Sequence, residues 1–332
     1  TQTIEQMIAL VTKAVGRDLL RAYPDVDYLD KTILTFMLDD IYQDCQVPFI
    51  FIIDEWDCIF RSRKNQLEEQ TKYLDFLRDL LKDKSYIALA YMTGILPIKK
   101  YGEHSAINVF YEYSMTDASP IEEFTGFTEQ EVRQLCEQYN MPFSETKKWY
   151  DGYCVDGVSI YNPKSVVEAM LRGKFSNYWT QTETYEALKI YIQSNEFGVQ
   201  DVILKLLAGE KEKIDTTTFS NDMVTFATKD DVLTLLVHLG YLTYNADTKE
   251  IWIPNDEVME QFISTVKVMG WGSVVTALET SEKLLQATLS GDEETVAELI
   301  EQAHQANAFI LKYNDENALS CVISLAYYSA QK

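Results

Sequence analysis

The sequence predicts an α/β fold with a parallel sheet near the N-terminus, followed by a mostly helical region. Two short apolar runs, Val47–Ile53 and Tyr86–Met92, show no polar–apolar alternation. Such runs are typical of strands buried on both faces by flanking helices. Between them, leucines including Leu67, Leu74 and Leu81 fall on one helical face. A strand, a helix and a second strand at this spacing indicate a βαβ crossover, which joins parallel strands.

Helices are expected on both sides of this crossover. Apolar residues recur every three or four positions over about the first 45 residues, which indicates amphipathic helices. Beyond the second strand, Thr128 and Glu131 form a capping box for a helix over Glu129–Tyr139. The dipeptide Asn162-Pro163 begins another helix, because Asn is a good cap and Pro fits the first helical turn.

The second half of the chain is predicted to be helical except for one hairpin. Amphipathic stretches cover roughly 184–194, 198–208 and 229–239, and the chain beyond about residue 270 is helical throughout. Two short strands, Tyr241–Tyr244 and Ile251–Ile253, flank a turn and precede a helix over Asn255–Val266. This order is typical of a winged-helix module. We therefore expect four parts: an α/β core over 1–125, a helical lid-like region over 126–225, a winged-helix-like module over 226–268 and a helical segment over 269–332.

Composition excludes several classes of protein. Of 332 residues, 52 are Asp or Glu and 29 are Lys or Arg, so the net charge of -23 disfavours general binding to nucleic-acid phosphates. The sequence contains no run of about 18 apolar residues, so it predicts no membrane-spanning helix. No signal peptide is visible at the N-terminus. The five cysteines are scattered without a CxxC pair, which indicates reduced thiols rather than a disulfide scaffold or a zinc site. We expect a cytoplasmic protein without a membrane partner.

The first apolar run ends in two acids, Asp54 and Glu55, which is the Walker B arrangement of a P-loop ATPase. The carboxyl edge of an open parallel sheet is where ligands bind. There Asp54 would bind Mg²⁺ of the Mg²⁺–ATP cofactor, because a hard cation prefers oxygen ligands. Glu55 would orient and deprotonate the attacking water. The alternative is a buried strand whose end meets solvent at two acids.

A polar residue also ends the second apolar run. Thr93, followed by Gly94, occupies the position of the sensor residue that contacts the γ-phosphate or the water in AAA-type ATPases. The alternative is a Thr-Gly turn that closes the strand. Lys99, a few residues further on, is a candidate phosphate contact or part of a solvated turn. Arg61 and Arg63 follow the first strand and are candidates for a trans-acting arginine in an oligomer.

An ordered series of short strings resembles the bacterial AAA-ATPase-like family. The series is FIFIIDEWD, YMTGILPIKK, EEFTGFTEQEV, KKWYDGY, IYNPKSVV and YWTQTET, and LLVHLGYLTY and IPNDEVMEQF continue it, so the likeness covers nearly the whole chain. The resemblance implies ATP and Mg²⁺ as cofactors, with Asp54, Glu55 and Thr93 at the γ-phosphate. It also implies a C-terminal PD-(D/E)XK nuclease domain that the ATPase regulates, which would be the only route to nucleic acid.

The sequence departs from that family in two places. Its phosphate-binding Gly-Lys-Ser/Thr loop would lie before Thr1, and the chain contains no such string. We therefore expect this chain alone to bind ATP poorly. At the other end, Glu316 is the candidate acid of the first nuclease helix, but the sequence stops at Lys332, before the strands that would complete a nuclease site. A capping or solvated role for Glu316 is the alternative.

Other functional readings stay open. The main alternative to an ATPase is a degenerate ATPase fold that acts as a protein-binding scaffold or homo-oligomer. A DNA-binding regulator is disfavoured, because the expected recognition helix over 230–239 contains no Lys or Arg. His238 in that helix is expected to be a packed histidine, not a ligand. The aromatic segment Trp149–Tyr153 is expected to serve packing, with Gly152 providing a turn.

Overall fold

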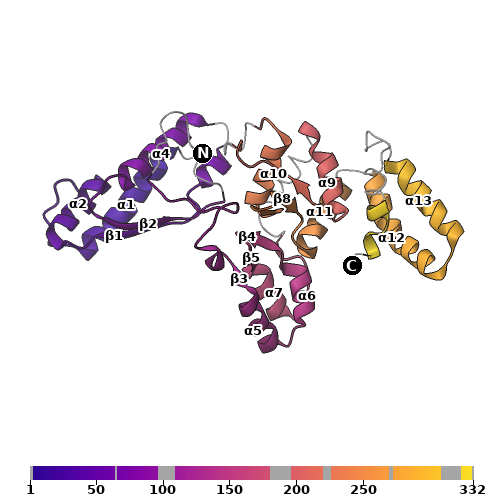
Figure 1. Cartoon of the computed structure of the whole chain (residues 1–332). Coiled ribbons are helices and arrows are strands. Elements are labelled where there is room, and N and C mark those ends of the chain that lie inside the picture. The colour runs from indigo at the N-terminus through magenta and orange to yellow at the C-terminus, as the bar shows by residue number, and fades with distance from the viewer. Residues whose placement is uncertain are drawn as a thin grey trace. The chain divides into compact units, whose positions relative to one another are not determined.

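The structure of the protein, a computed structural model, is shown in Figure 1. The structure describes residues 3–63, 66–95, 109–179, 196–219, 226–268, 272–307 and 323–330. These residues form two compact units, one up to Glu112 and one that takes in 113–219 and 226–332. The fold is mixed α/β with small sheets, as the sequence predicts at this level.

The first unit contains the predicted βαβ crossover. Strands β1 (Phe49–Ile53) and β2 (Ile87–Met92) pair in parallel, with Ile50 beside Leu89 and Ile52 beside Tyr91. The chain between the strands forms α3 (Cys58–Ser62) and α4 (Leu67–Leu81), and α1 (Ile4–Ala22) and α2 (Leu34–Cys45) precede them.

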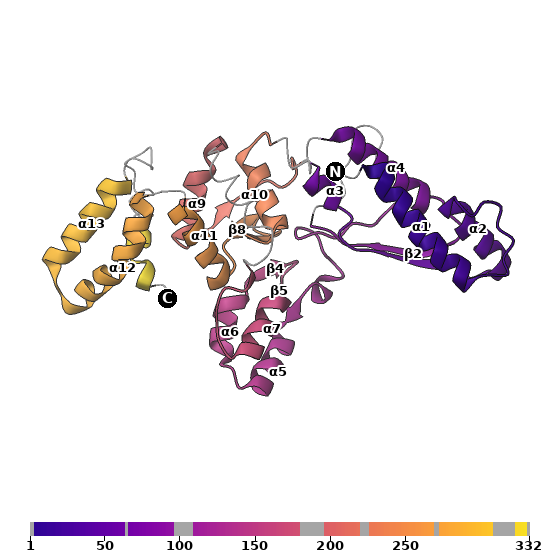
Figure 2. The ribbon, with the colours of Figure 1, turned by 180° about the vertical axis from the view of Figure 1, so that it is seen from behind.

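The helices of the first unit pack on the same side of the strand pair, in the views of both Figure 1 and Figure 2. Phe49, Phe51 and Ile53 of β1 contact buried side chains of α1, α2 and α4. Each Å² of apolar surface that they remove from water contributes about 25 cal/mol to the stability of this unit.

The expectation that both strands are buried on two faces is wrong for the described residues. Ile50 and Ile52 of β1 are 64% and 75% exposed, and Leu89 and Tyr91 of β2 are 54% and 52% exposed. Side chains alternate between the faces of a strand. The helices α1, α2 and α4 cover only the face that carries Phe49, Phe51 and Ile53. The unbroken apolar run therefore has one covered and one exposed face.

The second unit begins with a small three-stranded antiparallel sheet, in the order β3-β5-β4. Helix α5 starts at the predicted capping box, in which Thr128 and Glu131 bond each other's backbone N–H. Asn162 accepts hydrogen bonds from the first turn of α7, as expected. The elements are η1 (Glu122–Phe124), β3 (Phe127–Thr128), α5 (Glu129–Tyr139), α6 (Phe143–Tyr150), β4 (Tyr153–Val155), β5 (Val158–Tyr161) and α7 (Pro163–Arg172).

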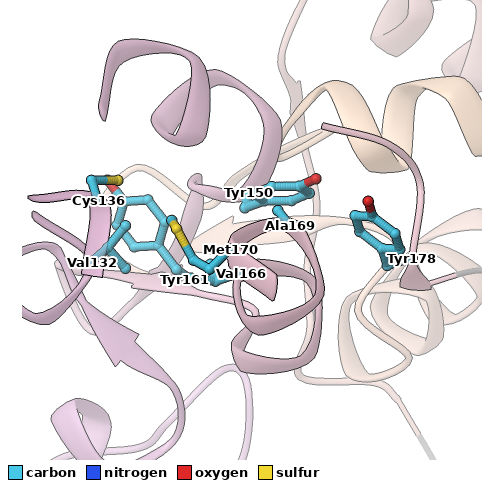
Figure 3. Close-up of a cluster of buried hydrophobic side chains, with 8 residues drawn as sticks. All are labelled: Val132, Cys136, Tyr150, Tyr161, Val166, Ala169, Met170 and Tyr178. Atoms are coloured by element: carbon cyan, nitrogen blue, oxygen red, sulfur yellow. The ribbon is translucent and has the colours of Figure 1, made fainter. Parts of the chain in front are cut away.

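Aromatic and aliphatic side chains fill the space between these elements (Figure 3). Val132 and Cys136 of α5 lie beside Tyr161 at one end of the cluster, and Tyr178 lies at the other. The hydroxyl of Tyr150 donates to the carbonyl of Ser176 at 3.0 Å, so its polar atom is satisfied although the ring is buried.

A second sheet, in the order β6-β8-β7, brings distant segments together. The predicted hairpin is β7 (Thr243–Asn245) and β8 (Glu250–Trp252), between α10 (Lys229–His238) and α11 (Asp256–Val268). Strand β6 (Glu212–Lys213) pairs with β8 and follows α9 (Val199–Leu207), and η3 (Glu196–Gly198) precedes that helix. Residues on both sides of the expected boundary between 225 and 226 therefore belong to one hydrogen-bonded sheet.

The aromatic segment Trp149–Tyr153 connects the two sheets of the second unit. The hydroxyl of Tyr153 donates to the carbonyl of Gly240 at 2.9 Å. Gly152 has a φ of +104°, and its Cα lies so close to Pro254 that a side chain would not fit. This supports the packing role that the sequence predicts for the segment.

The rest of the chain is helical where it is described. It forms α12 (Gly272–Ser290), α13 (Glu293–Asn307) and the short η4 (Tyr328–Ala330). The expected helix over 184–194 lies outside the described residues. Within the part of the chain that the structure describes, none of the helices has the length and apolar character needed to cross a membrane.

Candidate functional site

The candidate site lies where β1 and β2 end. Asp54 directly follows β1 and Thr93 directly follows β2, so both residues stand at the carboxyl edge of the parallel pair. The ladder continues one step beyond the strands, because Thr93 N–H donates to the carbonyl of Ile53 at 2.9 Å and Trp56 N–H donates to that of Thr93 at 3.0 Å. These backbone bonds fix the spacing between the two polar side chains.

The structure brings Asp54 and Thr93 together. The hydroxyl of Thr93 donates a hydrogen bond to Oδ1 of Asp54, and the backbone N–H of Glu55 donates to the same oxygen at 3.0 Å. Oδ2 of Asp54 has no bonding partner among the described residues, and the carboxylate is exposed. The edge therefore presents one carboxylate oxygen to solvent beside an oriented hydroxyl.

Glu55 is held in an unusual backbone conformation. Its φ is +50°, in the left-handed region that costs a residue other than glycine about 1–2 kcal/mol. Its carboxylate pairs with the guanidinium of Arg61, with 3.1 Å between Oε2 and Nη2. This ion pair was not predicted from the sequence, which suggested a trans-acting role for Arg61. A spacing of six residues across a turn and the short helix α3 has no periodic signature.

The two residues that follow these acids, Trp56 and Asp57, are both buried. Asp57 is fully buried, and its Oδ2 accepts from the backbone N–H of Ile95 at 3.2 Å and lies 3.4 Å from Nε of Arg61. Gly94 approaches so closely that a Cβ atom there would lie 2.7 Å from Trp56 and 2.9 Å from Asp57. Close packing therefore restricts which residues fit at these positions. Arg61 connects Asp57 to Glu55, because its guanidinium pairs with both carboxylates.

The donor set at this edge suits a hard cation in its chemistry, since all its donors are carboxylate and hydroxyl oxygens. The set is incomplete as a metal centre, because no group of three or more His, Cys, Asp or Glu side chains in the described ranges is arranged to hold an ion. Cys58 lies close by, but burial raises the pKa of its thiol above the usual value, which disfavours a nucleophilic thiolate.

The other predicted site residues do not join this edge. Lys99 and Glu316 lie outside the described residues. Arg63 pairs with Glu69 of α4 at 2.7 Å, which makes it a tie between two parts of the first unit. His238 stacks on Phe219, and burial lowers the pKa of its imidazole to about 4, in agreement with the expected packed histidine.

A hollow of about 440 Å³ opens on the second unit at the turn between α5 and α6. Arg133 lines it, stacks on the ring of Phe143 at 3.8 Å and pairs with Glu129 at 2.6 Å. The charge of Arg133 is therefore already paired, and none of the residues predicted from the sequence as site residues lines the hollow.

No family model matches the chain, and no solved structure matches it. An uncharacterized protein encoded in the vnfD 5′ region of Azotobacter chroococcum mcd 1 is 26% identical over 141 residues. The match takes in 41% of this chain and 27% of that protein, so the chain spans about a quarter of the relative's length.

Proposed function

We propose that the protein is an ATPase of the AAA-like P-loop type, with its acidic catalytic edge at the carboxyl ends of β1 and β2. The observation that supports this most directly is the hydrogen bond between the Thr93 hydroxyl and Asp54 Oδ1, which joins the ends of two parallel strands. Ligands of open α/β sheets bind at this edge. A carboxylate, a second carboxylate and a hydroxyl there match the groups that bind Mg²⁺ and orient the attacking water in phosphoryl transfer.

Each residue has a distinct task in this proposal. Mg²⁺, when bound, would neutralise charge on the phosphates, and Asp54 would hold it through Oδ2. Thr93 orients Asp54 through its hydrogen bond and would contact the γ-phosphate or the attacking water. Glu55 would accept the proton of that water at Oε1, the oxygen that Arg61 does not contact.

The proposed activity requires a phosphate-binding loop that this sequence does not contain. A Gly-Lys-Ser/Thr loop supplies backbone N–H groups and a lysine to the phosphates, and the chain has no such string. We therefore propose that activity belongs to a longer polypeptide that carries this loop, and that this chain alone turns over ATP poorly. Regulation of a fused nuclease follows from the family resemblance alone.

The test is ATP turnover by the polypeptide encoded by the whole reading frame, with the present chain measured beside it. Glu55→Gln should lower kcat about 100-fold or more while ATP still binds, because it removes the general base. Asp54→Asn should abolish the Mg²⁺ dependence of binding. Asp79→Asn is the matched control, since Asp79 is an exposed acid on α4 outside the edge. Turnover that is unchanged by Glu55→Gln contradicts the proposal.

A protein-binding scaffold is the second candidate. It is favoured by the internal bonds of the acids, since Asp54 serves its own neighbours and Glu55 is paired with Arg61. A scaffold requires no nucleotide. It would be supported if the longer polypeptide bound no ATP by calorimetry and if Asp54→Asn lowered only the stability of the first unit.

A further inference from the structure

The position of Arg61 is fixed by a buried acid of its own chain. Arg61 lies on the short helix α3, four positions after Asp57, and its Nε lies 3.4 Å from Oδ2 of that residue. The side chain of Asp57 is fully buried, and that of Arg61 is only 22% exposed. Burial of both side chains restricts their rotamers, so the guanidinium is already ordered before it contacts another group.

Glu55 depends on that guanidinium to keep one orientation. Its side chain is 68% exposed, and it follows β1 in a left-handed turn with a φ of +50°. Nη2 of Arg61 lies 3.1 Å from its Oε2 and donates a hydrogen bond to it. Exposed ion pairs usually contribute little, because two mobile side chains must be ordered. In this pair one partner is ordered already, so the bond restrains the other.

The same buried acid also contacts the end of the second strand. The backbone N–H of Ile95, two positions after Thr93, donates to Oδ2 of Asp57 at 3.2 Å. A Cβ atom at Gly94 would lie 2.9 Å from Asp57, so the backbone passes close to this carboxylate. Asp57 therefore contacts both the segment that carries Thr93 and the arginine that orients Glu55.

We infer that Arg61 is a positioning residue for Glu55, the general base of the proposed function on which this inference rests. Arg61 holds Oε2, so that Oε1 keeps one orientation for the proton of the attacking water, and Asp57 holds Arg61 in place. The same contacts disfavour the trans-acting role that the sequence suggests. An arginine that reached into another subunit would withdraw its charge from the buried carboxylate of Asp57, which is costly.

The expected effect is on kcat and not on the binding of ATP. Without Arg61, the exposed side chain of Glu55 regains its rotamers, so Arg61→Gln should lower kcat about 10-fold and leave KM for ATP unchanged. That change also alters the surroundings of a buried charge. The double variant Asp57→Asn/Arg61→Gln removes both charges and keeps a side-chain oxygen for the N–H of Ile95, and it should show the same loss.

Non-additivity with Glu55→Gln separates positioning from a purely structural role. In a polypeptide without the general base, Arg61→Gln should lower turnover no further, because no base remains to be positioned. A structural role would lower turnover about 10-fold in either background. Arg78→Gln is the matched control, since Arg78 also pairs with two acids, Asp75 and Asp79, but on α4 outside the edge. It should leave turnover unchanged.

The assay is ATP turnover by the polypeptide of the whole reading frame, as for the proposed function. If Glu55→Gln lowers turnover but both Arg61 variants keep the wild-type kcat, this inference alone is overturned. An equal loss in the Glu55→Gln background, or a change confined to KM, overturns it too. So does recovery of turnover when Arg61→Gln and Glu55→Gln polypeptides are mixed, because the arginine then acts between subunits. Turnover that is absent, or that does not respond to Glu55→Gln, refutes the proposed function as well.

Discussion

Replacing Gly152 with alanine tests whether the aromatic segment around it is a structural element. A Cβ atom at this position would lie 1.9 Å from the carbonyl oxygen of Pro254, whereas real Cβ atoms essentially never come within 3.0 Å of another heavy atom. Two backbone segments would have to separate by about 1 Å. The change therefore affects the junction between Trp149–Tyr153 and the start of α11.

The cost of the substitution has three parts. Alanine at a φ of +104° costs about 1–2 kcal/mol. Overpacking that moves the backbone adds about 1–3 kcal/mol. The separation also strains the buried hydrogen bond of 2.8 Å from Asn255 Nδ2 to the carbonyl of Asp151, which is worth about 1 kcal/mol. Together they predict a loss of about 3–6 kcal/mol from the second unit.

Hydrogen exchange measured by mass spectrometry suits this test, because it reports on each unit separately. Protection in peptides from α6 and α11 should fall about 100-fold or more in Gly152→Ala, since 1.4 kcal/mol corresponds to a factor of ten. Gly157→Ala is the control, because Gly157 also has positive φ, at +81°, but no atom lies within 4 Å of its added Cβ. Equal losses in the two variants would refute the packing argument.

Three other perturbations have definite signs. Burial raises the pKa of Glu257 above its ordinary 4.5, so the wild-type protein should gain stability relative to Glu257→Gln as the pH falls from neutral toward 4.5; paired urea titrations measure this. Burial lowers the pKa of His238 from 6.5 to about 4, so the unfolded chain binds the extra proton first. Unfolding free energy should therefore fall between pH 6.5 and 4, by roughly 2 kcal/mol given partial exposure of the ring, and a His238→Phe variant should lose that slope in urea titrations across this range. Gly94→Ala should destabilise the first unit by about 1–3 kcal/mol through its clash with Trp56, seen as faster exchange in β2.

Local structure could be predicted from the sequence because its causes are local. The cap at Thr128 and Glu131 joins residues three positions apart, and Asn162 accepts from the N–H groups of Lys164 and Ser165, two and three positions further on. The parallel pairing of β1 and β2 was also predictable, since a crossover of this length joins parallel strands. In these cases the interacting groups are close in sequence or fixed by connection length.

Burial and long-range pairing could not be predicted in this way. The unbroken apolar run of β1 suggests two covered faces, yet Ile52 is exposed, because whether a second face is covered depends on segments elsewhere in the chain. Likewise, Oε1 of Glu257 accepts the hydroxyl of Ser165 at 2.9 Å and the N–H groups of Tyr178 and Trp179 at 2.7 and 2.9 Å. These partners lie 78–92 positions away, so no periodicity in the sequence indicates that this carboxylate joins α7 to α11.

At the candidate site, too, the sequence predicts which residues meet but not which of their oxygen atoms are engaged in hydrogen bonds. That Asp54 and Thr93 meet follows from a shared sheet edge, which the positions of the two apolar runs indicate. Which oxygens face solvent does not follow, because Oδ1 of Asp54 is taken by Thr93 and by the N–H of Glu55, and Oε2 of Glu55 is taken by Arg61. A count of carboxylates gives four oxygens for chemistry, whereas hydrogen bonds within the described residues engage one oxygen of each acid. In a nucleotide site at this edge, Oδ2 of Asp54 and Oε1 of Glu55 are the oxygens that can bind a ligand without competing with the bonds that stabilise the turn after β1.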